Sequence, residues 1–242
     1  MAQLFDVVVI GAGPGGYIAA IRAAQLGFQV ACIDEWTNAS GGPAPGGTCT
    51  NVGCIPSKAL LQSSEHYEHA AHHFADHGIG VKGLTIDVAA MIGRKDAVVK
   101  QNNDGILYLF KKNKVDWLKG HAAFTSVNSL DVAGKSYTAK NIMIATGSSV
   151  MPLPGVEIDQ KVIVDSTGAL ELRQSPKRML VVGGGIIGLE MGTVYSTLGA
   201  RLDVVEMLDG LMQGADRDLV KIWQKMNAKR FDNMVLKTKT VA

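Results

Sequence analysis

The chain has 242 residues, of which 47% are hydrophobic and 28 are glycine. This length suits one large or two modest domains, and the apolar fraction is sufficient for buried cores. A formal net charge of +2 gives no electrostatic reason to expect binding to nucleic acid or to an anionic membrane. No stretch approaches the roughly 20 apolar residues of a membrane span, and the N-terminus lacks the basic flank of a signal peptide. With only three cysteines, too few for a secreted disulfide framework, the composition predicts a cytoplasmic α/β protein.

Hydrophobic periodicity and glycine or proline punctuation predict an alternation of strands and helices. The expected strands are 4–10, 29–34, several short strands within 115–137, 141–145, 179–182, 201–206 and 234–239. The expected helices are 15–26, 54–75, 86–112, 187–198 and 216–229. Strands 4–10 and 141–145 are predicted to be buried. Helix 86–112 contains Gly93 and Gly105, and either glycine could interrupt it.

Two segments repeat one pattern: a strand, Gly-x-Gly-x-x-Gly, a helix rich in small residues, and a strand that ends in an acid. The glycines are Gly11, Gly13 and Gly16 in the first segment and Gly183, Gly185 and Gly188 in the second. The acids, Asp34 and Glu206, follow the first glycine at the same interval. The first glycine permits a tight turn, the second a close approach of backbone to pyrophosphate, and the third helix–strand packing.

This repeat predicts an α/β fold with two Rossmann-like dinucleotide-binding domains, the second of them incomplete. Pro152, Pro154 and Gly155 mark a crossover, so the expected domains are 1–150 and 151–242. A complete doubly wound domain normally needs more strands than the second segment supplies.

The acid of the second segment, Glu206, also indicates which nicotinamide nucleotide is bound. A carboxylate accepts hydrogen bonds from ribose hydroxyls but repels a 2′-phosphate, and no arginine follows before Arg217. The sequence therefore favours NAD over NADP.

Cys49 and Cys54 flank a glycine-containing turn at a predicted helix start, a setting that favours the thiolate. In a reducing compartment such a pair is more often redox-active or metal-binding than structural. Zinc would need further ligands at a recognisable spacing, and the sequence offers none. Cys32 lies inside a predicted strand and is expected to be a small core residue.

Five histidines crowd one predicted helical region: His66, His69, His72, His73 and His77. Their i, i+4 spacing can bind a metal, but the acidic neighbours Glu65, Glu68 and Asp76 favour a solvated helical face. No metal site is predicted.

The segment from Gly46 to Lys58, which reads GGTCTNVGCIPSK, resembles the active-site segment of the pyridine nucleotide–disulfide oxidoreductases. Among them it is most similar to the dihydrolipoamide dehydrogenases, the flavoprotein components of 2-oxo acid dehydrogenase complexes. The resemblance covers the whole chain and includes Ile144–Ser148 and Gly183–Glu190.

The resemblance implies FAD and NAD as cofactors and assigns residues to each. For FAD they are Gly11, Gly13, Pro14, Gly15, Gly16, Asp34, Glu35, Gly47, Thr48, Lys58, Gly120, Ala145, Thr146, Gly147 and Ser148. For NAD they are Gly183, Gly185, Ile187, Gly188, Glu190, Glu206 and Thr240.

The resemblance also implies a reaction, the oxidation of protein-bound dihydrolipoamide to lipoamide with reduction of NAD through FAD. Cys49 and Cys54 would form a reversible disulfide, Cys49 exchanging with the lipoyl group and Cys54 facing the flavin as charge-transfer thiolate. Lys58 would lie beside the flavin and pair with Glu190. The implied partners are the lipoyl domains of the complex and, in the full-length form, a second copy of the chain.

The chain departs from the family pattern at four points. Thr50 replaces an apolar residue, Asp34 replaces glutamate at the ribose position with Glu35 as a possible substitute, and loop 37–46 is longer. The family's second half, including a His–Glu base supplied by the partner subunit, is absent, so the chain alone is expected not to turn over lipoamide. The alternatives are another FAD-dependent disulfide reductase, of glutathione or mercury type, and a cofactor-binding fragment without turnover. The sequence does not indicate which 2-oxo acid complex is served.

Overall fold

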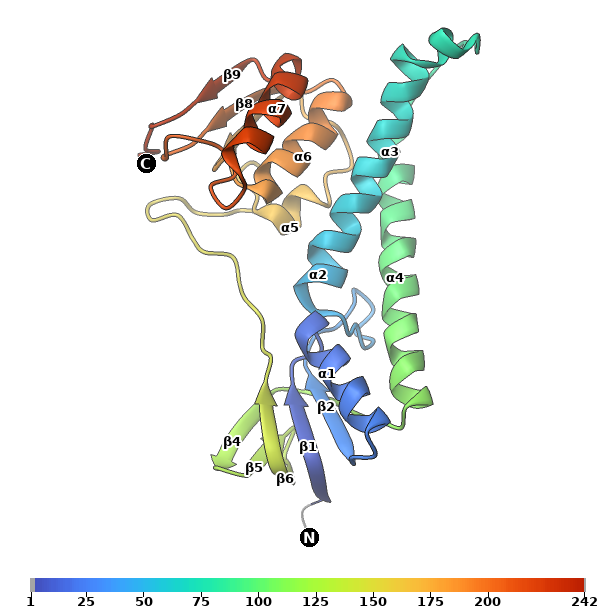
Figure 1. The fold of residues 1–242 in the computed structure, drawn as a ribbon, viewed down its shortest axis with the longest axis vertical. Coiled ribbons are helices and arrows are strands. Elements are labelled where there is room, and N and C mark those ends of the chain that lie inside the picture. Colours follow the sequence, from blue (N-terminus) through green and yellow to red (C-terminus); the bar gives the residue numbers. More distant parts are fainter. Residues whose placement is uncertain (1–2, 242) are drawn as a thin grey trace. The chain divides into compact units, whose positions relative to one another are not determined.

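The computed structural model describes residues 3–241 and confirms the α/β fold (Figure 1). The chain divides into two compact units, Met1–Pro56 with Asp96–Ser149, and Ser57–Lys95 with Val150–Ala242. Helices α3 (Cys54–His72) and α4 (Val88–Lys112) contribute residues to both. The assignment of a FAD domain to 1–150 and an NAD domain to 151–242 stays a prediction.

The first unit contains a six-stranded sheet with the order β3-β2-β1-β6-β5-β4. Strands β1, β2, β3 and β6 are parallel, and β4 and β5 join β6 as an antiparallel meander. The bounds are β1 Gln3–Ile10, β2 Val30–Asp34, β3 Asp116–Lys119, β4 Ala122–Ser126, β5 Ser129–Val132 and β6 Lys135–Ile144. The helices that lie wholly in this unit are α1 Pro14–Gln25 and α2 Gly47–Val52.

Strand β1 is buried because it lies between two parallel neighbours and is covered on both faces. Alternate side chains point to opposite faces. Val8 therefore joins the cluster that contains Leu130 of β5, whereas Val9 joins the cluster that contains Ala20 of α1 and Phe110 of α4. A strand covered in this way needs a mostly apolar sequence, which β1 provides in its last four residues, Val7–Ile10.

The second unit contains a three-stranded parallel sheet with the order β7-β8-β9. The strands are β7 Arg178–Val182, β8 Arg201–Val205 and β9 Asn233–Val235. The helices are α5 Ser166–Ala169, α6 Ile186–Thr197 and α7 Arg217–Asn227, with 3₁₀ turns η1 Phe74–His77 and η2 Ala228–Arg230. Leu202 and Val204 of the central strand pack with Leu189 of α6 and Val220 of α7.

Most predicted elements are confirmed, but three expectations were wrong. Helix α4 is continuous, and a side chain at Gly93 or Gly105 would have open space around it, so neither glycine marks a break. Residues 141–145 are not a separate buried strand. Residues 141–144 are the end of β6, and Ala145 follows the strand. Met143 and Ile144 are 40% and 65% exposed, in the part of β6 that extends beyond its pairing with β5 at Lys135–Thr138.

The third correction concerns the last strand, which ends at Val235 instead of continuing to 239. Lys237 adopts a left-handed backbone conformation with φ of 53°. The amides of Lys237 and Thr238 donate to the carbonyl oxygens of Leu208 and Glu206, which draws the chain away from the sheet direction.

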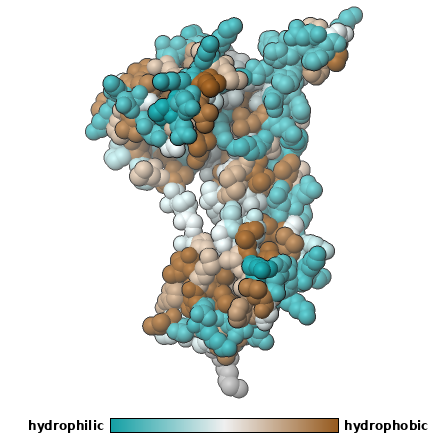
Figure 2. All heavy atoms as spheres, viewed as in Figure 1, coloured by the Kyte–Doolittle hydropathy of each residue, from teal (hydrophilic) through white to brown (hydrophobic). Residues whose placement is uncertain are grey.

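Apolar side chains reach the surface of both units alongside polar ones (Figure 2). Among the described residues, no helix combines the length and apolar character that crossing a bilayer requires.

Candidate dinucleotide and thiol sites

The first and third glycines of the first fingerprint are required by close backbone packing. Gly11 has a φ of 101°, and a Cβ on it would lie 2.2 Å from the carbonyl oxygen of Ala145. A Cβ on Gly16 would lie 1.7 Å from the carbonyl oxygen of Gly11. No other residue fits at these two positions without a shift of the backbone.

The middle of the same fingerprint is bare backbone. A Cβ on Gly13 would meet only the Cα of Gly47, at 3.7 Å, and one on Gly15 would meet nothing within 4 Å. Pro14 begins α1, and within the described residues no side chain caps that helix. Pro14 has no amide hydrogen, and the amide of Gly16 donates to the carbonyl of Gly13 at 2.9 Å. The open backbone at Gly13 and Gly15 and the positive end of the helix fit the pyrophosphate of a dinucleotide.

The second fingerprint repeats this arrangement at α6. Gly183 has a φ of 103°, and a Cβ on Gly188 would lie 2.7 Å from the carbonyl oxygen of Gly183. Gly185 has open space around it and precedes α6, which no described side chain caps. Ile187, in the first turn, is 63% exposed, whereas Thr240 lies beyond β9 and is half-buried. The open glycine and uncapped helix fit a second dinucleotide.

The acid that ends β2 is bonded to the first fingerprint. Asp34 Oδ2 accepts from the amide of Ala12 at 2.6 Å, and its Oδ1 accepts from the amide of Trp36 at 2.7 Å. Glu35 Oε2 lies 3.1 Å from Nδ1 of His121, and its role at the ribose stays a prediction. Each Asp34 oxygen keeps a second lone pair that could accept from a ribose hydroxyl.

Glu206 has the same relationship to the second fingerprint. Its Oε2 accepts from the amide of Gly184 at 2.7 Å, and its Oε1 accepts from the amide of Leu208 at 2.8 Å. The sequence predicted a ribose-binding role for both acids but missed that each one also holds its own glycine turn in place.

Five further residues predicted to contact FAD, Gly120 and Ala145 to Ser148, lie at the carboxyl edge of the first sheet. Gly120, with φ of 145°, donates from its amide to the carbonyl of Asp34 at 3.0 Å. Ala145 donates to the carbonyl of Ile10 at 2.8 Å, and Thr146, Gly147 and Ser148 continue from it as an exposed segment. Ligands of parallel α/β sheets bind at this edge.

The two thiols of the cysteine pair lie at the starts of consecutive helices. Cys49 is half-buried in α2, and Cys54 is the exposed first residue of α3. Gly53 separates the helices, and a Cβ on it would lie 2.9 Å from the carbonyl oxygen of Thr48 and 3.3 Å from the Cα of Cys49. The glycine thus lets the start of α3 approach the first turn of α2.

The cysteine segment packs directly against the first fingerprint. A Cβ on Gly47 would lie 2.7 Å from the Cα of Gly13, so the two backbones touch. Thr50, which replaces an apolar residue of the family pattern, is buried against Gly46. A Cβ added to Gly46 would lie 2.4 Å from the side chain of Thr50. Exposed Thr48 lies in the same first turn of α2. The thiols are therefore adjacent to the expected FAD site within one unit.

Two asparagines that sequence reasoning missed hold this segment in place. Asn51 Nδ2 donates to the carbonyls of Ala44 and Gly47 at 2.9 and 3.0 Å. Buried Asn103 Nδ2 donates to the carbonyl of Pro45 at 2.6 Å and to Asn51 Oδ1 at 3.1 Å. The available signal was a polar residue at an inward-facing position of the helix 86–112.

Cys32 is fully buried, which confirms its predicted place in the core. Burial, with a contribution from the charge of Asp34, raises the pKa of the Cys32 thiol to about 12. Its Sγ lies 3.8 Å from the carbonyl oxygen of Gly11, which it contacts as a weak donor. This thiol is protonated at neutral pH and unsuited to exchange.

The predicted contact between Lys58 and Glu190 is confirmed. Lys58 Nζ lies 2.5 Å from Glu190 Oε1, and both residues belong to the second unit. Their side chains are 62% and 22% exposed. The pair is therefore accessible to a ligand as well as to solvent.

The histidine-rich region shows one ring contact, between His69 and His73, whose centroids lie 5.5 Å apart in an edge-on arrangement. Across residues 3–241, no group of three or more His, Cys, Asp or Glu side chains is arranged to hold a metal ion. The expectation that this helix binds no metal stays a prediction.

Residues 5–241 match the family model described as pyridine nucleotide-disulphide oxidoreductase. A dihydrolipoyl dehydrogenase of Cupriavidus necator is 48% identical over 236 residues, covering 95% of this chain and 50% of that protein. A mitochondrial dihydrolipoyl dehydrogenase of Pisum sativum is 49% identical, covering 98% and 47%. The chain thus spans about half the length of these relatives.

Among solved structures, the HOCl-induced flavoprotein disulfide reductase RclA from Escherichia coli matches with a TM-score of 0.79 at 26% identity. The match covers 97% of this chain and 49% of that one. Together with the paired thiols and the two fingerprints, these matches show that the chain belongs to the pyridine nucleotide-disulphide oxidoreductase family.

Proposed function

We propose that this chain provides the FAD-binding, NAD-binding and thiol-bearing parts of a dihydrolipoyl dehydrogenase. The observation that carries the proposal is the packing of the cysteine segment on the first fingerprint, with Gly47 against Gly13. It supports a thiol pair that exchanges electrons with a bound flavin. The names of the 48% and 49% identical relatives support dihydrolipoamide as the reductant.

The thiol chemistry begins from a Cys49–Cys54 disulfide. A lipoyl thiolate attacks Cys49 Sγ, which forms a mixed disulfide and releases Cys54 as a thiolate. The second lipoyl thiol then attacks the lipoyl sulfur of the mixed disulfide, closes the lipoyl ring and releases Cys49. Two electrons have passed from the lipoyl group to the protein thiols, and the rate depends on the thiolate fraction of each attacking group.

Exposure does not distinguish the roles of the two thiols, because both are at least partly accessible. The assignment of Cys49 to the lipoyl group and Cys54 to the flavin rests on the family resemblance. FAD, when bound, supplies the two-electron transfer between the protein dithiol and NAD.

The two fingerprints hold the two nucleotides in this proposal. The uncapped start of α1 binds the pyrophosphate of FAD, and Asp34 accepts from its ribose while keeping the turn amide of Ala12. The start of α6 and Glu206 do the same for NAD, and the carboxylate of Glu206 disfavours a 2′-phosphate. Lys58 and Glu190 place a balanced pair of charges beside the flavin.

The proposed partners follow from the resemblance to the dihydrolipoyl dehydrogenases. Lipoyl domains of a 2-oxo acid dehydrogenase complex deliver the dithiol, and in the full-length protein a second copy supplies the base at the disulfide. Such a base contributes roughly 10²–10⁴-fold in rate, so the 242 residues alone are expected to be nearly inactive.

The test is NADH formation from NAD and dihydrolipoamide by the full-length gene product loaded with FAD. Cys49→Ser and Cys54→Ser should each abolish the reaction, and Cys32→Ala, a buried thiol outside the pair, should retain it. Normal activity in either serine variant would refute the proposal.

A further inference from the structure

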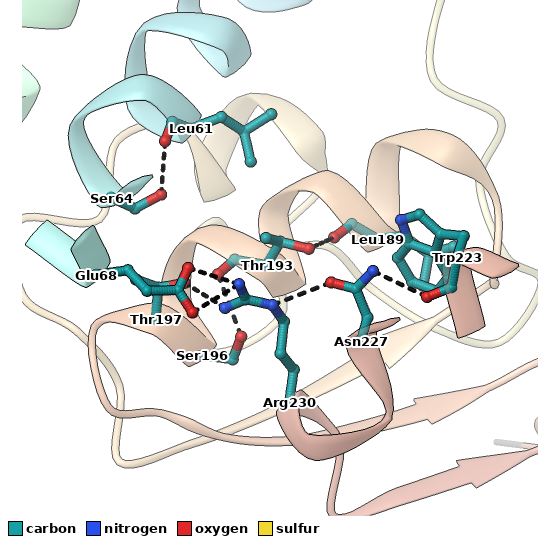
Figure 3. Close-up of polar contacts among 10 residues, drawn as sticks. All are labelled: Leu61, Ser64, Glu68, Leu189, Thr193, Ser196, Thr197, Trp223, Asn227 and Arg230. Carbon is teal, nitrogen blue, oxygen red and sulfur yellow. Dashed lines mark hydrogen bonds and ion pairs between the residues drawn. The ribbon is translucent and has the colours of Figure 1, made fainter. Parts of the chain in front are cut away.

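A partly buried polar cluster in the second unit centres on Arg230 and belongs to neither fingerprint (Figure 3). Arg230 Nη2 donates to both oxygens of Glu68, at 2.8 and 2.6 Å. Its Nη1 donates to Thr197 Oγ1 at 2.7 Å, and its Nε donates to Asn227 Oδ1 at 3.0 Å. The guanidinium thus bonds in three directions, and the side chains of Arg230 and Glu68 are only 22% and 29% exposed.

The cluster joins three helices and the turn that carries Arg230. Glu68 lies on α3, Thr197 is the last residue of α6, and Asn227 is the last residue of α7. Asn227 is itself fixed, because its Nδ2 donates to the carbonyl of Trp223 at 2.9 Å. In Figure 3 Glu68 and Arg230 point toward one another, with Asn227 on the opposite side of the guanidinium.

Helices α3 and α6 are joined at a second place by the Lys58–Glu190 pair. On α3, Lys58 and Glu68 are ten residues apart, about 15 Å along the helix, and on α6 Glu190 and Thr197 are seven apart, about 10 Å. A helix fixed at one such point has less freedom to slide or rotate at the other. The position of Lys58 relative to Glu190 therefore depends on the Arg230 cluster.

The two junctions differ in strength. The Lys58–Glu190 pair is a single contact made by a lysine that is 62% exposed. Exposed ion pairs of this kind contribute little free energy to a fixed geometry. In the Arg230 cluster, one guanidinium nitrogen donates to both oxygens of Glu68, and the other two nitrogens donate to a hydroxyl and an amide, at a less exposed site. Planar, multiply bonded arginine contacts of this kind fix orientation far better than one ammonium.

We propose that Arg230 is a positioning residue that fixes α3 against α6 and thereby brings Lys58 to Glu190. Its importance for catalysis rests on the proposed function, in which that pair lies beside the flavin. Arg230 itself touches no reacting group.

The experiment measures the pair directly in the 242-residue chain, without cofactor. A water-soluble carbodiimide joins a lysine to a carboxylate only where the two are in contact, and peptide mass spectrometry quantifies the Lys58–Glu190 product. Arg230→Gln should lower its yield at least about threefold, since a lost charge-assisted contact shifts a local equilibrium by that factor or more. Arg230→Lys, which keeps the charge but not the planar fork, should restore the yield only in part.

Arg201→Gln is the matched control. Arg201 lies in the same unit and forms an exposed ion pair with Asp232, which is on neither α3 nor α6. It should leave the yield unchanged. If Arg230→Gln does not fold, Glu68→Gln and Thr197→Val remove single members of the cluster and should each lower the yield by less. An unchanged yield in the folded variants would overturn the proposal.

A second readout separates this inference from the proposed function. With FAD bound, Arg230→Gln should shift the flavin absorbance spectrum in the same direction as Glu190→Gln. A lower crosslinking yield without a spectral shift in either variant would leave Arg230 as the positioning residue. It would contradict the placement of the pair beside the flavin.

Discussion

Lys58 and Glu190 are 132 positions apart in the chain, and their charged atoms lie 2.5 Å apart in the structure. This contact links α3, which begins at Cys54, with α6, which begins within the second fingerprint. The lysine is largely exposed, so the pair contributes little to folding. In the proposed function, the pair matters because it positions two opposite charges near the bound flavin.

We therefore expect Glu190→Gln to separate stability from cofactor chemistry. The free energy of unfolding, measured by urea denaturation, should fall by less than ~1 kcal/mol because the pair is exposed. The absorbance spectrum of bound FAD should change, because the proposed function places Lys58 beside the flavin and the substitution removes its counter-charge. A loss of several kcal/mol with an unchanged flavin spectrum would show that the pair is structural.

The glycines of the first fingerprint divide into two classes that substitution can distinguish. Gly13→Ala should leave stability nearly unchanged, because the added Cβ meets only a 3.7 Å contact, but should abolish FAD binding. Gly16→Ala should destabilise the fold by roughly 1–3 kcal/mol or more, because the carbonyl of Gly11 occupies the space. Thermal melts and flavin content of the purified proteins provide both measurements, and equal effects of the two substitutions would contradict this division.

Glu206 should prove to have two roles. Glu206→Gln replaces one acceptor oxygen by a donor that faces a backbone amide, which should cost about 1–3 kcal/mol of stability. Loss of the negative charge should also narrow the preference for NAD over NADP, measured by the affinity of each nucleotide. Glu157→Gln, an exposed glutamate of the same unit, is the control and should change neither. Tighter wild-type binding of NADP than of NAD would overturn the assignment.

Cys32 should make stability depend on alkaline pH. Its pKa is about 12 in the folded protein against a reference value of 9.0, so the unfolded chain releases this proton first as pH rises. The contribution of Cys32 is fully present below pH 9 and is lost between pH 9 and 12, at up to ~1.4 kcal/mol per pH unit. The difference in unfolding free energy between wild type and Cys32→Ala should therefore change across that window. A constant difference would contradict the raised pKa.

The fold and the glycine sites could be predicted from the sequence because their signals are local. Only glycine satisfies the contacts at Gly11 and Gly16, and only a covered strand needs the run in β1. The Lys58–Glu190 contact could be predicted only from the family resemblance, because the positions of the two residues in the sequence do not indicate that they meet.

The supporting polar contacts could not be predicted. Glu68 and Arg230 are 162 positions apart, and the bond from Asn103 to Pro45 spans 58. Such pairs form only after helices have packed, so neither partner carries a local pattern that identifies the other. The exposed end of β6 was mispredicted for a related reason, because the extent of its pairing with β5 is a property of the sheet and not of residues 141–145.

The central claim is that two electrons pass between the Cys49–Cys54 pair and bound nucleotide. The most direct test is to treat air-oxidised, FAD-loaded protein with one equivalent of NADH without oxygen and then alkylate it under native conditions. Mass spectrometry should show two newly labelled cysteines, Cys49 and Cys54, with Cys32 unlabelled, and no change in Gly13→Ala, which lacks the flavin. Labelling that does not respond to NADH, or that appears at Cys32 instead of the pair, would contradict the account.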